Sequence, residues 1–389
     1  MSGLNSFKEI VSEVESGRIT SANSIPISAW FLPEWDKLST KKAANLFFSL
    51  LITTVNEARE LMPEIYGGYS PNLKLNSIDD FYRLPILVKD TSVDTIGFRN
   101  KVAKNPLSMA PHGLPHSFIY KSGGTKGVAT PTFITQNDRK VESYGLARCF
   151  SAMGMKKGDT ILSTYNPTHK GGEIIKEAST ILQMQFIPRR TTDTASDIIN
   201  TIRDYSVNVL ATVQGPLSPD GDNTKKGGGV DFVALVDEGQ DILESTVNTY
   251  FITGYKLIDE VINWSEAYNK KLATTLGSSE AIPQASSTIG GDSRFCKYNN
   301  MHLNYGPHFV EIVKYESGTM VPVKKNERGI LIYTTLAREG TRYIRYAPGD
   351  SVKFLGDMEC SCGRKSPIIT DIDRIDVPNE IIQNGCCIG

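Results

Sequence analysis

The chain has 389 residues, of which 40% are apolar and 22% charged, and its formal net charge at pH 7 is −1. This composition is typical of a globular protein with one large domain or two to three small ones. The near-zero net charge gives no electrostatic reason to expect nucleic acid or an acidic membrane as a partner. The polar, acidic start (1–17) does not have the pattern of a secretory signal, and the longest mostly apolar run (43–55) is too short to span a bilayer. We therefore expect a cytoplasmic protein, in which the six cysteines do not form a disulfide framework.

The first part of the chain has a mostly helical pattern. Helices are predicted at 7–14, 41–61 and 78–82, and the short apolar run 86–88 then introduces an extended segment. Between 137 and 213, helices alternate with short strands. The predicted helices are 138–153, 172–182 and 195–205, and the predicted strands are 160–163, 185–187 and 207–213. Such alternation favours right-handed βαβ crossovers and a largely parallel sheet.

The second half begins with a polar, glycine-rich stretch at 218–229, which predicts a loop or an insertion. From about residue 305 the sequence is rich in strands, predicted at 308–315, 329–336 and 351–355. The fold class that we expect is α/β with parallel sheets. We divide this single core into three segments: a mostly helical one (1–85), an α/β one (86–290) and a β-rich one with the C-terminal tail (291–389).

A glycine-rich loop lies between two expected strands, 117–120 and 132–135, and reads S-G-G-T-K-G. Successive backbone N–H groups in such a turn form a concave nest that holds anions, phosphate above all. The candidate phosphate-binding residues are Ser122, Gly123, Gly124, Thr125 and Gly127. The loop joins a strand to a strand, whereas the common nucleotide-binding fingerprints join a strand to a helix. An ordinary hairpin turn is the alternative.

Four residues of the second half have the composition of a zinc site. Cys296 is followed six residues later by His302, and a C-x-C pair, Cys360 and Cys362, precedes Gly363. Three thiolates and one imidazole form a tetrahedral ligand set that suits structural zinc, and a glycine after the pair allows a tight turn around a metal. The alternative is four unrelated residues, because cysteine is often buried in cytosolic proteins.

Four blocks in a fixed order resemble the large N-terminal domain of the adenylate-forming, acyl-activating enzymes. They are the glycine-rich loop, 276–280 (L-G-S-S-E), 346–350 (Y-A-P-G-D) and 373–376 (D-R-I-D). In detail the chain is most similar to the phenylacetate–CoA ligases and to the acyl-protein synthetase of the luminescence fatty-acid reductase. In some phenylacetate–CoA ligases the same Cys, His, Cys and Cys hold zinc. The resemblance covers roughly residues 80–389 and implies an α/β core with a zinc-bearing, β-rich subdomain.

The resemblance implies that the chain forms an acyl adenylate. A carboxylate must then attack the α-phosphorus of ATP, so neutralising the charge of two anions is the main task of the site. Glu280 is expected to hold Mg²⁺ and Ser279 to bond the α-phosphate, with Gly277 and Ser278 in the same nucleotide-binding block. Lys126, where the family usually has threonine, adds a cation beside the phosphates.

The resemblance also implies roles for three further residues. Asp350 is expected to accept hydrogen bonds from both ribose hydroxyls, Arg374 to reach ribose or phosphate, and His169 to orient the substrate carboxylate. From the residues alone each has a plainer interpretation. Glu280 reads as a solvated surface acid, Asp350 as a turn residue before the strand 351–355, and His169 as a solvated loop residue.

The C-terminal residues of the chain indicate a candidate for the residue that accepts the acyl group. The chain stops at Gly389, before the small C-terminal domain that CoA ligases of the family carry. The luminescence acyl-protein synthetases end at about the same place and have their acyl-accepting cysteine near the C-terminus. Cys386, with Cys387 as its nearest competitor, is therefore the expected acceptor.

The function that the sequence predicts is ATP-dependent activation of a carboxylic acid, followed by transfer of the acyl group to a thiol. One alternative is an acid–CoA ligase that lacks or borrows its C-terminal domain, and another is an inactive binding module of the same fold. ATP, Mg²⁺ and Zn²⁺ are the expected cofactors. The expected partners are a small carboxylic acid and an acyl-accepting protein, a carrier protein or CoA, with no nucleic acid or membrane. The identity of the acid and a homodimeric state are left open.

Overall fold

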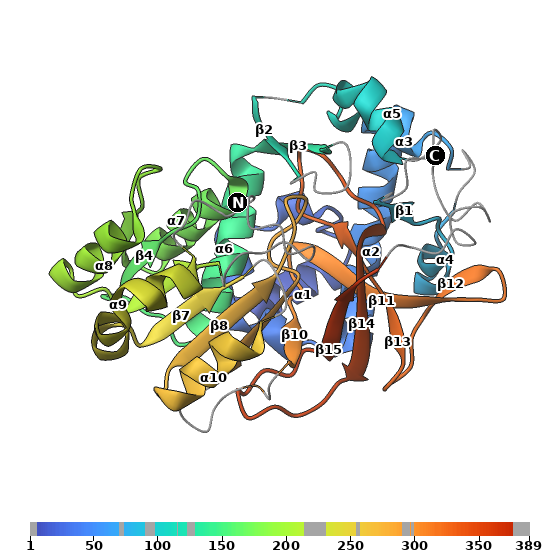
Figure 1. Ribbon diagram of the computed structural model, residues 1–389. Coiled ribbons are helices and arrows are strands. Elements are labelled where there is room, and N and C mark those ends of the chain that lie inside the picture. The colour runs from blue at the N-terminus through green and yellow to red at the C-terminus, as the bar shows by residue number, and fades with distance from the viewer. Residues whose placement is uncertain are drawn as a thin grey trace.

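The computed structural model describes residues 6–69, 74–89, 98–114, 116–122, 129–213, 231–253, 257–289, 296 and 299–375 (Figure 1). Its α-helices are α1 (Phe7–Glu15), α2 (Thr40–Leu61), α3 (Pro63–Tyr66), α4 (Ile78–Tyr82), α5 (Phe98–Lys104), α6 (Gln136–Ala152), α7 (Lys170–Ile181), α8 (Ala195–Asp204), α9 (Phe232–Thr246) and α10 (Asp259–Ala267). Short 3₁₀ helices are η1 (Ala22–Ser24), η2 (Ile27–Phe31), η3 (Pro33–Lys37) and η4 (Pro106–Met109).

The strands form one large sheet and one separate hairpin. They are β1 (Leu87–Val88), β2 (Ser117–Lys121), β3 (Pro131–Thr135), β4 (Thr160–Ser163), β5 (Gln185–Pro188), β6 (Val209–Thr212), β7 (Thr249–Ile252), β8 (Lys271–Leu276), β9 (Ala285–Ile289), β10 (Met301–Leu303), β11 (His308–Glu316), β12 (Thr319–Pro322), β13 (Arg328–Thr335), β14 (Tyr346–Gly356) and β15 (Ile368–Arg374). The order in the large sheet is β12-β11-β13-β14-β15-β10-β9-β8-β7-β6-β4-β5, with β1 beside β14, and β2 pairs with β3.

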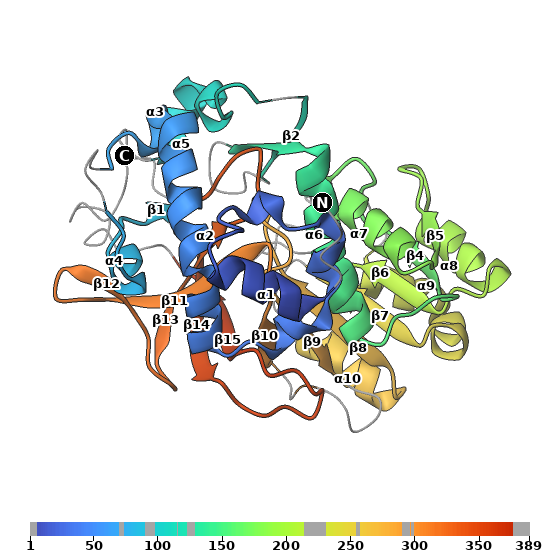
Figure 2. The same cartoon turned by 180° about the vertical axis from the view of Figure 1, so that it is seen from behind.

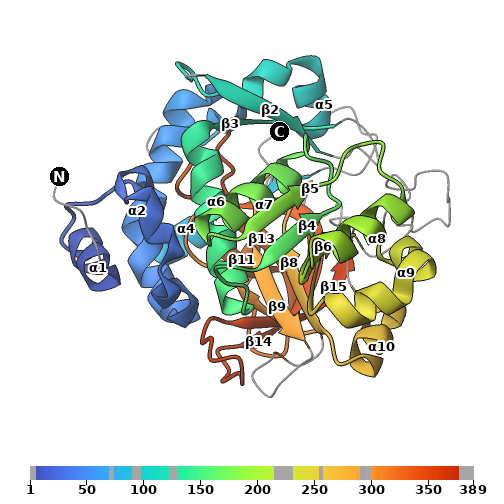
Figure 3. The ribbon, with the colours of Figure 1, turned by 90° about the vertical axis from the view of Figure 1, so that its left-hand side faces the viewer.

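The strands β4 to β8 run parallel to one another and have helices on both faces (Figure 3). Ile161 and Phe251 share a buried cluster with α6 and α7, whereas their neighbours Leu162 and Tyr250 share another with α8, α9 and α10. Successive side chains of a strand point to opposite faces of the sheet, so apolar residues at consecutive positions mark strands that are covered twice. The predicted α/β fold class with parallel strands is confirmed.

The antiparallel half of the sheet is covered by the N-terminal helices (Figure 2). Helix α2 begins after the N-cap Ser39, whose hydroxyl accepts from Lys42 N, and its buried residues recur at helical spacing. On this face the ring of Phe47 lies 6.0 Å from Phe309 of β11 and 5.7 Å from Trp35 of η3, between ring centroids. The predicted helix 41–61 is therefore confirmed, and it packs the N-terminal segment onto the sheet.

One predicted boundary is wrong in a way that matters for the site. The strand expected from residue 351 begins at Tyr346, because β1 pairs in parallel with Tyr346 and Ala347 and so draws this segment into the sheet. Gly349 has a φ of 96°, a value that glycine adopts without strain. Asp350 consequently lies inside β14, and its interpretation as a turn residue before a strand is wrong.

Three sequence-based expectations have a limited outcome. The predicted loop at 218–229 lies outside the described residues. Within the described ranges, the helices are all too short or too polar to cross a membrane. The division into three segments stays a prediction, since the large sheet runs through both the α/β and the β-rich segments.

Candidate functional site

The carboxylate of Glu280 is fully buried between the two halves of the sheet, at 0% side-chain exposure. Its Oε1 accepts from Lys89 Nζ at 2.8 Å and from the Tyr346 hydroxyl at 3.1 Å, while Oε2 has no hydrogen-bond partner among the described residues. Lys89 directly follows β1, and its N–H donates to Ala347 O at 2.9 Å, so the pairing of β1 with β14 places its side chain here. Burial raises the pKa of Glu280, but the Lys89 ammonium and further hydrogen bonds to the carboxylate together lower it by more, and the pKa lies below its usual value.

The turn that carries Glu280 joins β8 to β9 and is closed by its own backbone. Ser278 N donates to Ala281 O at 2.9 Å, and Ala281 N donates back to Ser278 O at 3.1 Å. The Ser278 hydroxyl lies 3.1 Å from the Tyr333 hydroxyl. A Cβ at Gly277 would lie 3.3 Å from the Ile282 side chain, so this position favours glycine. The predicted block 277–280 is thus a compact turn and not a solvated surface loop, since its acid is buried.

Asp350 and Arg374 lie opposite each other on β14 and β15. Arg374 Nη1 donates to Asp350 Oδ1 at 2.8 Å and to Pro348 O at 3.0 Å. Burial raises the pKa of Asp350, and the charges of Arg374 and Lys89 lower it in part. The structure therefore brings together two residues that the sequence predicted separately, and Lys89 interacts with both Asp350 and Glu280.

The glycine-rich loop joins the two strands that the sequence predicted, β2 and β3, which pair antiparallel. At its start the buried Ser122 donates its N–H to Thr130 O at 3.0 Å, and its hydroxyl accepts from Thr130 N at 2.9 Å. The strand–loop–strand arrangement is confirmed. The loop residues with predicted phosphate contacts, Gly123, Gly124, Thr125, Lys126 and Gly127, lie outside the described residues.

His169 is the N-cap of α7, and its Nδ1 accepts from Gly171 N at 3.2 Å. The residue is exposed. The next residue, Lys170, reaches the turn that carries Glu280, because its Nζ donates to Ser279 O at 2.9 Å. Cys386 and Cys387 lie outside the described residues.

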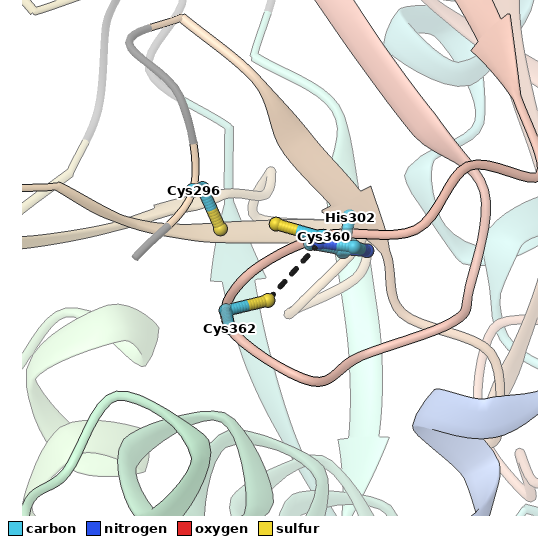
Figure 4. A group of neighbouring side chains, drawn as sticks. All are labelled: Cys296, His302, Cys360 and Cys362. Atoms are coloured by element: carbon cyan, nitrogen blue, oxygen red, sulfur yellow. Dashed lines mark hydrogen bonds between the residues drawn. The ribbon is translucent and has the colours of Figure 1, made fainter. Parts of the chain in front are cut away.

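Cys296, His302, Cys360 and Cys362 come together from β10 and two loops (Figure 4), as the sequence predicted. Their ligand atoms all lie within 4.8 Å of one another. In a tetrahedral zinc site with bonds of about 2.0–2.3 Å, ligand atoms lie about 3.5–4 Å apart. Small side-chain movements would therefore bring the four ligand atoms to the distances that zinc requires. His302 Nδ1 lies 2.8 Å from Ser366 O, which makes it the protonated nitrogen and leaves the Nε2 lone pair for a metal.

A buried cation lies directly behind this cluster. Arg364 Nη2 lies 3.3 Å from Cys296 Sγ, and Nη1 donates to Ser286 Oγ at 2.6 Å. The hydrogen bond with Cys362 lowers the pKa of Cys296 well below its usual value against the effect of burial, and His302 and Arg364 lower it further. A cysteine that is readily ionised beside a guanidinium fits a metal site, because thiolates are the form that binds zinc.

Sequence reasoning missed Lys89, Lys170 and Arg338. Arg338 Nη2 donates to the backbone oxygen of Glu280 at 3.1 Å, and its side chain is 1% exposed. The sequence around these residues gives little indication of their position in the site: Lys89 follows an apolar run, and Lys170 and Arg338 lie within polar stretches. Their contacts join residues that are 58 to 191 positions apart in the chain, and no local pattern reports such pairs.

Comparisons with known proteins found a related sequence and solved structures with a similar fold. No protein-family model matches the sequence. A phenylacetate–coenzyme A ligase from Thermus thermophilus is 27% identical over 252 residues, which span 63% of this chain and 52% of that protein. A crystal structure of 2-hydroxyisobutyryl-CoA ligase in an open conformation with 2-HIB-AMP and CoA matches 88% of this chain and 76% of its own, with a TM-score of 0.66 at 16% identity. The same ligase in its thioesterification state matches 88% of this chain and 70% of its own, with a TM-score of 0.68 at 17% identity.

The chain has the fold of 2-hydroxyisobutyryl-CoA ligase and is similar in sequence to a phenylacetate–coenzyme A ligase. At 16–17% identity the solved structures show the fold alone, and the chain spans about half the length of the curated relative that it matches. In this protein, the sequence blocks around Glu280, Asp350 and Arg374 meet around Lys89. The roles of these residues stay predictions.

Proposed function

We propose that this adenylate-forming protein activates a carboxylic acid with ATP and Mg²⁺ and passes the acyl group to a thiol. The observation that carries the proposal is the buried Glu280 carboxylate, which keeps one oxygen without a partner in the described structure while Lys89 neutralises the other. A buried, unpartnered carboxylate oxygen is costly unless a ligand completes it. A divalent cation that is bound to a nucleotide is such a ligand.

In the proposed site, the chain's residues bind and orient the nucleotide. Asp350 accepts from the ribose hydroxyls, with Arg374 beside it at 2.8 Å, and Ser279 bonds the α-phosphate. Glu280 offers Oε2 to Mg²⁺, which when bound supplies charge neutralisation at the phosphate oxygens. Lys89 adds a fixed positive charge close to both acids, where a carboxylate and a phosphate must approach each other.

The proposed identity of the thiol rests on the relatives and not on the described contacts. The similarity to a phenylacetate–coenzyme A ligase supports CoA as the acceptor and an aryl or small acid as the substrate. The acyl-protein synthetase alternative assigns the acceptor role to Cys386. An inactive binding module of the same fold would keep the buried acid but show no chemistry.

We also propose that Cys296, His302, Cys360 and Cys362 hold one structural zinc ion. The clustered ligand atoms, the hydrogen-bonded His302 and the adjacent Arg364 support it. A closed set of four protein ligands leaves no open position for chemistry. The ion would join the loop after β9 to the loop between β14 and β15, and so stabilise the edge of the site.

Pyrophosphate–ATP exchange with a panel of short, long and aryl acids tests the proposed activity. We expect acid-dependent exchange in the wild-type protein and a loss of about 100-fold in Glu280→Gln, since preorganised charge in such sites contributes about this much. Glu316→Gln is the matched control, because it removes an exposed carboxylate at the end of β11. Absence of exchange with every acid, or full exchange in Glu280→Gln, would contradict the proposal.

A further inference from the structure

A group of three buried charges lies directly behind the turn that carries Ser279 and Glu280. Glu142 comes from α6, Lys170 is the first residue of α7, and Arg338 lies between β13 and β14. Their side chains are 2%, 0% and 1% exposed. Lys170 Nζ lies 3.0 Å from Glu142 Oε1 and 2.7 Å from Oε2, and Arg338 Nη2 also donates to Oε1. Two cations therefore share one carboxylate.

Each cation also holds one backbone oxygen of the turn. Lys170 Nζ donates to Ser279 O at 2.9 Å, and Arg338 Nη2 donates to Glu280 O at 3.1 Å. Lys170 Nζ also donates to Glu142 Oε1, and its 2.7 Å distance to Glu142 Oε2 is an ion-pair contact. Because the Lys170 side chain is completely buried, we expect its effect on a ligand to pass through the turn.

Stability alone does not account for this arrangement. A buried ion pair adds little over apolar side chains of the same volume, because desolvation offsets its attraction.

We infer that Lys170 and Arg338, joined by Glu142, are positioning residues that hold the carbonyls of Ser279 and Glu280 so that the side chains of these two residues face the nucleotide. The inference rests on the proposed function, because it assigns a role within the same site. In this arrangement α6 and α7, which pack against each other (Figure 3), set the geometry of a turn more than 100 residues away in the chain.

The test compares Lys170→Met and Lys170→Arg with a matched control, Arg148→Met. Arg148 is a buried cation of α6 that pairs with Asp36 and donates to the backbone oxygens of Trp30 and Tyr305, and not to those of the turn. The first readout is amide hydrogen exchange at residues 278–281 in protein without ligand, where Ser278 N and Ala281 N are hydrogen-bonded across the turn. The second is kcat and the KM for ATP in pyrophosphate exchange.

In Lys170→Met we expect amide hydrogen exchange at residues 278–281 to become roughly tenfold faster or more. We also expect kcat to fall by about 100-fold, because a reacting group that is misplaced by about 1 Å costs about this much in rate. Lys170→Arg should recover a large part of both, since a guanidinium can still bridge Glu142 and the carbonyl. Arg148→Met should leave the protection of 278–281 as in the wild type.

Unchanged protection of 278–281 in Lys170→Met would overturn the inference, as would equal loss of that protection in Arg148→Met. If Lys170→Met does not fold, Arg338→Gln is compared in its place, and wild-type protection and kcat in that variant overturn the inference equally. Hydrogen exchange does not depend on catalysis. A wild-type protein that lacks all pyrophosphate exchange therefore refutes the proposed function, while the protection data still decide the role of the charged group.

Discussion

Replacing Asp350 with alanine should weaken ATP binding without unfolding the protein. In the proposed site the carboxylate accepts hydrogen bonds from both ribose hydroxyls, and hydrogen bonds to charged acceptors contribute about 1.5–3 kcal/mol each. Because such contributions are not additive, we expect a loss of about 2–3 kcal/mol for the pair, which corresponds to a Kd for ATP that rises roughly 30- to 150-fold.

The structure indicates that this substitution has little effect on stability. Arg374, the partner of Asp350, is 65% exposed, and an exposed ion pair contributes about 0–1 kcal/mol. Burial also raises the pKa of Asp350. A carboxylate whose pKa is higher in the folded state costs stability at pH values above its unfolded pKa, so its removal at neutral pH costs the fold nothing electrostatically. The loss of affinity can then be attributed to the ribose contacts.

Isothermal titration calorimetry with ATP and Mg²⁺ measures the effect, with thermal unfolding followed in parallel. Asp373→Ala is the matched control, since Asp373 lies beside Arg374 on β15 and pairs with Arg328 at the surface. We expect its affinity for ATP to equal that of the wild type. A folded Asp350→Ala protein that binds ATP as tightly as the wild type would refute the assignment of the ribose site.

Three further predictions concern the cysteines and their surroundings. Freshly purified protein should contain about one zinc ion per chain by metal analysis, and Cys362→Ser should lose it, because three ligands hold a structural ion poorly. Arg364→Met should weaken zinc binding about 10- to 100-fold in a chelator competition, since outer-shell partners of metal ligands typically contribute this much. Incubation with labelled acid, ATP and Mg²⁺ should place a hydroxylamine-sensitive label on Cys386 if the chain carries its own acceptor, as mass spectrometry of wild-type protein and Cys386→Ser would show.

Each of these predictions has an outcome that contradicts it. Protein without zinc in which Cys360 and Cys362 react freely with a thiol reagent excludes the metal site. Zinc affinity that is equal in Arg364→Met and the wild type shows that the guanidinium does not support the thiolates. Adenylate that forms with no label on Cys386 or Cys387 makes the acceptor external, in agreement with the CoA-ligase alternative.

The amino-acid sequence by itself determined the local elements and the fold class. The helices α6, α7 and α8 and the strands β4, β5 and β6 lie within a few residues of their predicted positions. Their signals are local: alternation or helical spacing of apolar residues, and caps such as Thr135, whose hydroxyl accepts from Asp138 N at the start of α6. The four potential zinc ligands and the strands on both sides of the glycine-rich loop were also predicted from short patterns.

Only the tertiary structure decided how the site is assembled. Lys89 meets Glu280 because β1 pairs with β14, and Asp350 meets Arg374 because β14 pairs with β15. The burial of Lys170, which lowers its pKa to about 8, likewise depends on the packing of α7 against α6 and on the turn after β8. Periodicity and capping report what a residue's neighbours in the chain require. A buried charge is determined by partners far away in the chain, because only the folded sheet brings them within hydrogen-bonding distance.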